Sequence, residues 1–141
     1  MLRTTIALCA AAAFLALAAG AAADPTPVPI DSEATVGGID VGCTGIGESK
    51  LDPKWQAYPV RVEFSDANND YLANEVLTVR SASGAELLTV ACEGPWILLK
   101  LPTGSYSVIG RVPGTSAQPR TATFRPPSHG QMRVVLKFPD L

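Results

Sequence analysis

The sequence has little of the material from which most enzyme and metal sites are built. Its 141 residues include one histidine and three cysteines, which leaves few side chains for a metal centre or a catalytic triad. Charged residues make up 17% of the chain and the formal net charge is -2, so a nucleic-acid-binding surface is not expected. Twelve glycines and twelve prolines argue against a helical bundle.

Three patterns that resemble reactive or ligand-binding motifs are incomplete. Serine hydrolysis would need His129 as the base, and no Gly-x-Ser-x-Gly elbow is present. The glycine-rich segment 37–47 resembles a phosphate loop, but we expect no strand before it, and neither a Lys-Ser pair nor a long helix follows. We therefore expect no enzyme activity and no cofactor, and interpret segment 37–47 as an arm that passes close to a sheet.

Segment 66–70 has oxygen-bearing side chains at alternate positions, as a calcium loop does. Tyr71 stands where such a loop needs glycine and Leu77 where it needs glutamate, which excludes an EF-hand. A hairpin loop rich in Asp and Asn is the main interpretation, and a weak surface calcium site is the alternative.

The N-terminus has the pattern of a signal peptide. Arg3 precedes an apolar run over 6–19, and Ala21-Ala22-Ala23 supplies the small residues that a signal peptidase accepts. We therefore expect export to the periplasm or the exterior, and no later stretch approaches the ~20 apolar residues of a membrane span. The expected divisions are a signal peptide (1–23), a Pro-rich flexible leader (24–36) and one β domain (37–141).

Two cysteines, Cys43 and Cys92, remain after the expected cleavage. An exported chain meets an oxidising compartment, where two cysteines allow a single disulfide pairing. The alternative is a pair of buried thiols packed as small apolar side chains.

The hydrophobic period becomes two from Val60 onward, which indicates half-buried strands. Asp52 followed by Pro53 predicts a helix of one or two turns just before them. We expect a seven-stranded antiparallel β-sandwich with at most this one short helix. The expected strands are 60–65, 77–80, 88–92, 96–101, 106–112, 121–125 and 131–138.

Gly94-Pro95-Trp96 and the following Leu-Pro-x-Gly-x-Tyr segment, with Pro102, Gly104 and Tyr106, resemble the carboxypeptidase regulatory-like domains. Among proteins with such domains, the chain more closely resembles the small exported proteobacterial ones. That resemblance covers roughly residues 37–138 and implies a transthyretin-like (immunoglobulin-like) sandwich without catalysis. The cysteine pair departs from the usual members.

Physical roles can be assigned within this motif. Gly104 allows a turn with positive φ, and Tyr106 can bury its ring while its hydroxyl bonds to a backbone carbonyl. Trp96 is interpreted as a core anchor, with an exposed sugar-stacking platform as the alternative.

The C-terminal half is basic. Arg111, Arg133 and Lys137 form one patch if their strands are adjacent, and this patch would face an anionic envelope partner or an acidic protein surface. The alternative is that these cations only keep the sheet soluble and block edge pairing.

The function expected from these features is that of a non-catalytic exported module, which binds an unidentified protein of the cell envelope through an edge strand or a loop end. One alternative is a carbohydrate or small-ligand binder that uses Trp55, Trp96 and nearby tyrosines. The other is a purely structural envelope protein that associates through its strand edges.

Overall fold

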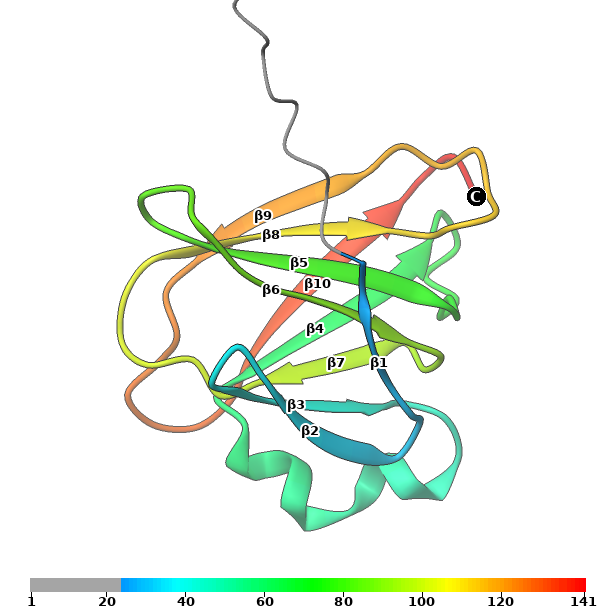
Figure 1. The fold of residues 1–141 in the computed structure, drawn as a ribbon. Coiled ribbons are helices and arrows are strands. Elements are labelled where there is room, and N and C mark those ends of the chain that lie inside the picture. The colour runs from blue at the N-terminus through cyan, green and yellow to red at the C-terminus, as the bar shows by residue number, and fades with distance from the viewer. Residues whose placement is uncertain (1–23) are drawn as a thin grey trace, which may run out of the picture.

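Two five-stranded β-sheets pack face to face across an apolar core in the computed structural model, which describes residues 24–141 (Figure 1). The predicted signal peptide lies outside the described residues. The β5 sheet has the order β1-β6-β5-β8-β9, and the β7 sheet has the order β10-β4-β7-β3-β2. The strands are β1 (Thr26–Val28), β2 (Ser32–Val36), β3 (Ile39–Thr44), β4 (Val60–Asp66), β5 (Glu75–Ser81), β6 (Glu86–Cys92), β7 (Trp96–Leu99), β8 (Tyr106–Arg111), β9 (Arg120–Phe124) and β10 (Met132–Phe138).

The all-β sandwich is confirmed, but the prediction of seven antiparallel strands is wrong. The seven expected strands are present as β4 to β10, and three further strands precede them. Both sheets are mixed, because β1 pairs parallel with β6 and β10 pairs parallel with β4. Parallel partners lie far apart in the sequence, so no turn motif between them signals the pairing.

Residues 24–36, expected to form a flexible leader, instead contribute β1 and β2. Val28 of β1 is buried in the core. The glycine-rich segment that follows is not a free arm, because it forms β3, with Val41 and Cys43 at 0% exposure. A strand therefore does precede it. The period-two signal was hidden here by prolines in β1 and glycines around β3.

The core is the layer of side chains between the two sheets. Phe64 of β4 and Phe138 of β10 stack at 6.0 Å between ring centroids. Gly110 leaves room for Phe64 and Leu136, since a Cβ there would lie 2.5 Å from Leu136 and 2.8 Å from Phe64. Alternate residues of these strands point inward, so the residues between them point to the outer faces.

The disulfide between Cys43 and Cys92 is confirmed. Cys43 lies in β3 of the β7 sheet and Cys92 in β6 of the β5 sheet, so the bond joins the two layers rather than an arm to a sheet. Both residues belong to the buried core.

Two short 3₁₀ helices, η1 (Glu48–Leu51) and η2 (Pro53–Ala57), connect β3 to β4, where at most one short helix was expected, and lie below the β7 sheet in Figure 1. The predicted helix start is confirmed, because the side chain of Asp52 accepts a hydrogen bond from the backbone N–H of Lys54 at 2.9 Å. Over residues 24–141, no helix has the length and apolar character needed to cross a membrane.

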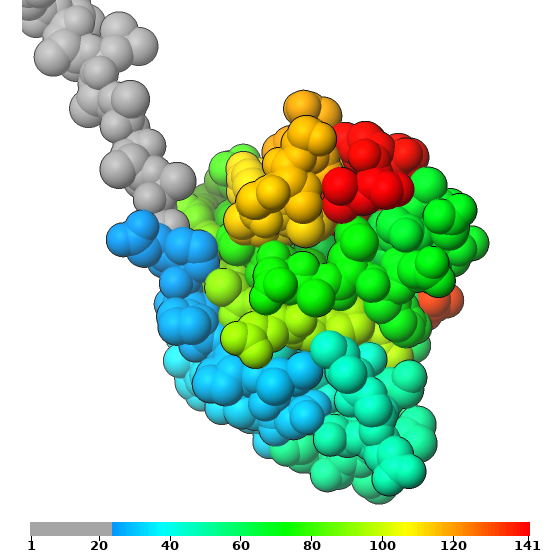
Figure 2. Space-filling view, turned by 90° about the vertical axis from the view of Figure 1, so that its right-hand side faces the viewer, coloured from blue at the N-terminus to red at the C-terminus, as the bar shows by residue number. Residues whose placement is uncertain are grey.

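The C-terminal residues lie beside the loop between β8 and β9 (Figure 2). Asp140 accepts a hydrogen bond from the backbone N–H of Gln118 at 2.8 Å and lies 3.5 Å from Arg120. The bond from Gln118 is the main reason that the pKa of Asp140 lies below its ordinary value.

Glu75, at the start of β5, has a side-chain carboxyl group buried in the sandwich without a partner. It is 0% exposed, and neither side-chain oxygen has a hydrogen-bond partner. Burial raises its pKa to about 9 from an ordinary value of 4.5, so Glu75 holds its proton at neutral pH in the folded protein.

Stability should fall as the pH rises from about 5 to 9. The unfolded chain loses the Glu75 proton near pH 4.5 and the folded chain keeps it to about 9, so raising the pH favours unfolding. The expected contribution is about 1.4 kcal/mol per pH unit for one proton. Urea unfolding at several pH values measures this slope. Glu75→Gln should reduce it, whereas Glu93→Gln, at an exposed site, should not.

Replacing both cysteines by alanine should lower the free energy of unfolding by about 3–4 kcal/mol, because the bond closes a long loop in the unfolded chain. The two cysteines are 49 positions apart. Urea unfolding of the oxidised protein and the double variant measures the difference. An equal midpoint and slope for the two proteins would contradict the expectation.

Candidate functional site

The outer face of the β7 sheet is covered on one half and open on the other. The covered half lies over β7 and β3, where Trp55 and Tyr58 pack against Leu98. Gly42 of β3 makes this possible, because a Cβ there would lie 2.7 Å from the Trp55 ring. The indole N–H of Trp55 also donates to the carbonyl of Ser49 at 2.8 Å, which fixes the ring under η1.

The open half carries two arginines that share one buried carboxylate. Arg61 and Arg133 lie opposite each other on the adjacent parallel strands β4 and β10. Glu63 is 1% exposed and lies between them, with Oε1 2.9 Å from Arg61 Nε and Oε2 hydrogen-bonded to Arg133 Nε. This hydrogen bond and the charge of Glu63 raise the pKa of Arg133 above its ordinary value.

An aromatic pair lies beside the two arginines. The guanidinium carbon of Arg61 is 4.2 Å from the centroid of the Trp96 ring, and the ring of Tyr71 meets Trp96 edge-on at 6.2 Å. Trp96 is only 8% exposed, but it lies on the outer face of the sheet and not between the sheets. It therefore anchors this outer cluster, and it is too deeply covered to serve as a sugar platform.

The far edge of the same sheet is β2, a strand hydrogen-bonded on one side only. Lys100 N–H donates to the carbonyl of Asp40 at 3.0 Å, so the backbone groups of Asp40 point toward β7 and away from β2. Thr35 lies opposite Asp40, and its own N–H and C=O therefore point to the free edge. By the same alternation, the backbone N–H and C=O of Glu33 also point to the free edge.

A polar groove of about 390 Å³ runs beside this edge. Tyr58 donates a hydrogen bond to Glu33 at 2.6 Å, and Thr35 donates one to Asp40 at 2.7 Å. Burial is the main reason that the pKa of Tyr58 lies above its ordinary range, and the hydrogen bond to the Glu33 carboxylate raises it further. Lys100 completes the groove, 3.9 Å from Asp40.

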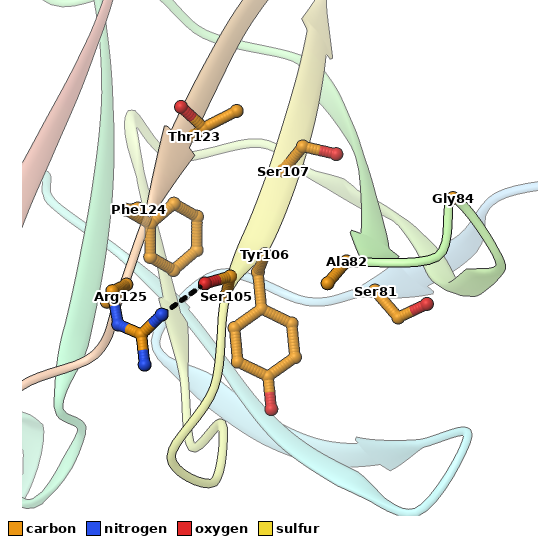
Figure 3. A pocket seen from close by; sticks show the side chains of 9 residues that line it. All are labelled: Ser81, Ala82, Gly84, Ser105, Tyr106, Ser107, Thr123, Phe124 and Arg125. Atoms are coloured by element: carbon orange, nitrogen blue, oxygen red, sulfur yellow. Dashed lines mark hydrogen bonds between the residues drawn. The ribbon is translucent and has the colours of Figure 1, made fainter.

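A second hollow, of about 490 Å³, opens at one end of the β5 sheet (Figure 3). Tyr106 and Phe124 stack there at 6.1 Å, and Arg125 donates to the hydroxyl of Ser105 at 2.7 Å. The predicted hydrogen bond of Tyr106 is confirmed, since its hydroxyl donates to the Pro102 carbonyl at 2.9 Å, but its ring is only half-buried. The predicted positive φ of Gly104 is also confirmed, at 148°.

The three residues of the expected basic patch do not lie together. Arg133 and Lys137 point outward from β10 on the β7 sheet, whereas Arg111 points outward from β8 on the other sheet. The arginine that accompanies Arg133 is Arg61, which the sequence alone did not single out. Its outward position in the alternation of β4 was visible, but its pairing with β10 was not.

The Asp- and Asn-rich segment forms the loop after β4. One carboxylate oxygen of Asp66 accepts backbone N–H bonds from Asn68 at 2.8 Å and from Asp70 at 2.9 Å. This is the hydrogen-bond pattern of a turn. In the part of the chain from residue 24 onward, no three or more His, Cys, Asp or Glu side chains gather as a metal site.

No protein-family model and no curated protein matches the sequence.

Proposed function

We propose that this chain is a non-catalytic exported module that binds a protein of the cell envelope by accepting an extended segment at the β2 edge. The observation that carries the proposal is that Glu33 and Thr35 present backbone donors and acceptors to an unpaired edge. Strand addition at such an edge supplies affinity through main-chain hydrogen bonds, and neighbouring pockets supply specificity through side chains. The groove beside Tyr58 and Thr35 is placed to provide those side-chain contacts.

The other three strand edges in the described chain carry residues that oppose pairing. β1 contains Pro27, which lacks an N–H donor. β9 begins with Arg120 and is followed at once by Arg125 and a proline, and β10 carries Arg133 and a lysine. β2 contains no proline, lysine or arginine, so it is the edge best suited to a partner strand.

The charge around β2 favours a basic partner. Six acidic residues and one lysine lie between Asp24 and Asp52. Asp31 and Glu33 stand at the start of β2, and Asp40 lies across from it. We therefore propose that the partner segment is extended and carries lysine or arginine at alternate positions.

The proposal keeps the resemblance to the carboxypeptidase regulatory-like domains, and with it a transthyretin-like fold. It is compatible with the seven strands expected from the hydrophobic alternation, which correspond to β4–β10. The alternative of a sugar binder built on Trp55 and Trp96 loses support, because both indoles are buried under other side chains.

A seven-residue peptide with alternating lysine and valine should bind at β2. The amide signals of Glu33, Thr35 and Tyr58 should shift in a nitrogen-15 NMR titration, and the amide of Thr35 should become protected from hydrogen exchange. The same peptide with glutamate in place of lysine should bind more weakly, because the edge is acidic.

Two substitutions separate strand addition from side-chain contact. Thr35→Pro removes the N–H that faces the free edge and breaks no backbone hydrogen bond between β2 and β3, although it also removes the side-chain bond to Asp40, so peptide binding should be lost. Thr35→Val keeps that N–H and removes the hydroxyl, so binding should remain. Shifts located away from β2, or equal binding by the Thr35→Pro variant, would refute the proposal.

A further inference from the structure

We infer that Arg61 and Arg133 form a binding site for a phosphate monoester, with Glu63 as the positioning residue. This site lies on the outer face of the β7 sheet at β4 and β10. These strands are at the edge of the sheet opposite to β2. It does not depend on the proposed function at β2.

Glu63 orients both guanidinium groups before any ligand arrives. It contacts each arginine at Nε, which leaves the terminal amino groups of each guanidinium free to donate elsewhere. The Trp96 ring supports Arg61 from one face at 4.2 Å. Arg133 remains 57% exposed and is directly accessible from solvent, whereas Arg61 is 21% exposed. Less rotational freedom is then lost when an anion binds.

The site also holds polar atoms that have no hydrogen-bond partner. Six buried side-chain nitrogen or oxygen atoms in residues 24–141 lack one, and three of them belong to this cluster: Arg61 Nε, Glu63 Oε1 and Trp96 Nε1. The 2.9 Å contact between Arg61 and Glu63 is an ion pair in which the N–H is not aligned for a hydrogen bond. Buried polar groups are ordinarily paired, so this concentration sets the cluster apart from the rest of the described chain.

The surroundings combine positive charge with exposed apolar surface. Lys50 lies 6.0 Å from the Trp96 ring, and Lys137 follows Arg133 along the outward side of β10. Tyr71 is 46% exposed, and Val135, which lies opposite Glu63, is 44% exposed. A ligand that carries an anionic head and an organic body fits this arrangement better than a bare ion.

The number of donors favours phosphate over carboxylate. A carboxylate has two oxygens and is satisfied by one guanidinium fork. A phosphate monoester has three terminal oxygens arranged around the tetrahedral phosphorus. It can therefore accept hydrogen bonds from two guanidinium groups that approach from different sides. Arg61 and Arg133 lie on neighbouring strands, which are about 4.8 Å apart in a sheet, so one phosphate can bridge them.

Isothermal titration calorimetry of the purified chain with glucose 1-phosphate tests the site. Saturable binding is expected, stronger than binding of glucuronate, and weaker at high salt. Arg133→Gln should weaken binding about tenfold or more. Arg133→Lys keeps the positive charge but lacks the paired N–H donors of a guanidinium, so it should also weaken binding. Arg125→Gln, directly after β9 of the other sheet, is the matched control and should bind as the unchanged chain does. No saturable binding, or equal binding by the Arg133→Gln variant, would overturn the proposal.

Glu63→Gln separates positioning from net charge. Removing a negative charge should tighten anion binding if charge alone decides, whereas loss of the shared carboxylate should weaken binding if Glu63 positions the arginines. Weaker binding is expected, and Glu63→Asp should restore part of it. Tighter binding by a folded Glu63→Gln variant, with folding checked by circular dichroism, would overturn the role of Glu63.

The phosphate can belong to a soluble ester or to a lipid headgroup. Vesicles containing phosphatidic acid, which exposes a phosphate monoester, test the second source against vesicles of phosphatidylglycerol, which does not. Binding of glucose 1-phosphate alone supports a soluble ligand. Binding of both glucose 1-phosphate and phosphatidic acid vesicles, each lost in Arg133→Gln, supports a headgroup. Binding to the two kinds of vesicle alike, with no effect of the substitution, would refute the site.

Discussion

The packing of two sheets against one apolar layer determines where every other side chain of the sandwich can lie. Val60, Val62 and Phe64 of β4 enter this layer, so Arg61 and Glu63 between them must point to the outer face. The same alternation in β10 places Arg133 on that face. Both candidate surfaces on the β7 sheet follow from this constraint, because each is made of residues excluded from the core.

The outer face of the β7 sheet is then divided by a small number of contacts. Gly42 leaves space for the Trp55 ring, and the segment containing η1 and η2 covers β3 and β7. Beyond that cover, the two sides of the sheet differ in charge. Glu33 and Asp40 lie at the β2 side, and Arg61 and Arg133 at the β10 side. One chain therefore presents two chemically distinct surfaces on a single sheet.

Two buried glutamates have opposite surroundings. Glu63 lies between two guanidinium groups, which offset the cost of burying its charge. Glu75 has no partner, and burial instead raises its pKa to about 9, so it is protonated when folded. The first arrangement organises a surface, and the second lowers stability as the pH rises.

The sequence by itself was sufficient to predict the strands β4–β10, the short helix after Asp52, and the two cysteines as candidates for one bond. These features depend on local alternation, on capping residues and on a single possible pairing. Only the tertiary structure decided that β1, β2 and β3 belong to the sheets, because proline and glycine mask alternation there. It also decided that Arg133 lies beside Arg61 and apart from Arg111. Arg61 and Arg133 are neighbours because β4 pairs in parallel with β10, a strand about 70 residues later in the chain. No local sequence pattern indicates which distant strands pair.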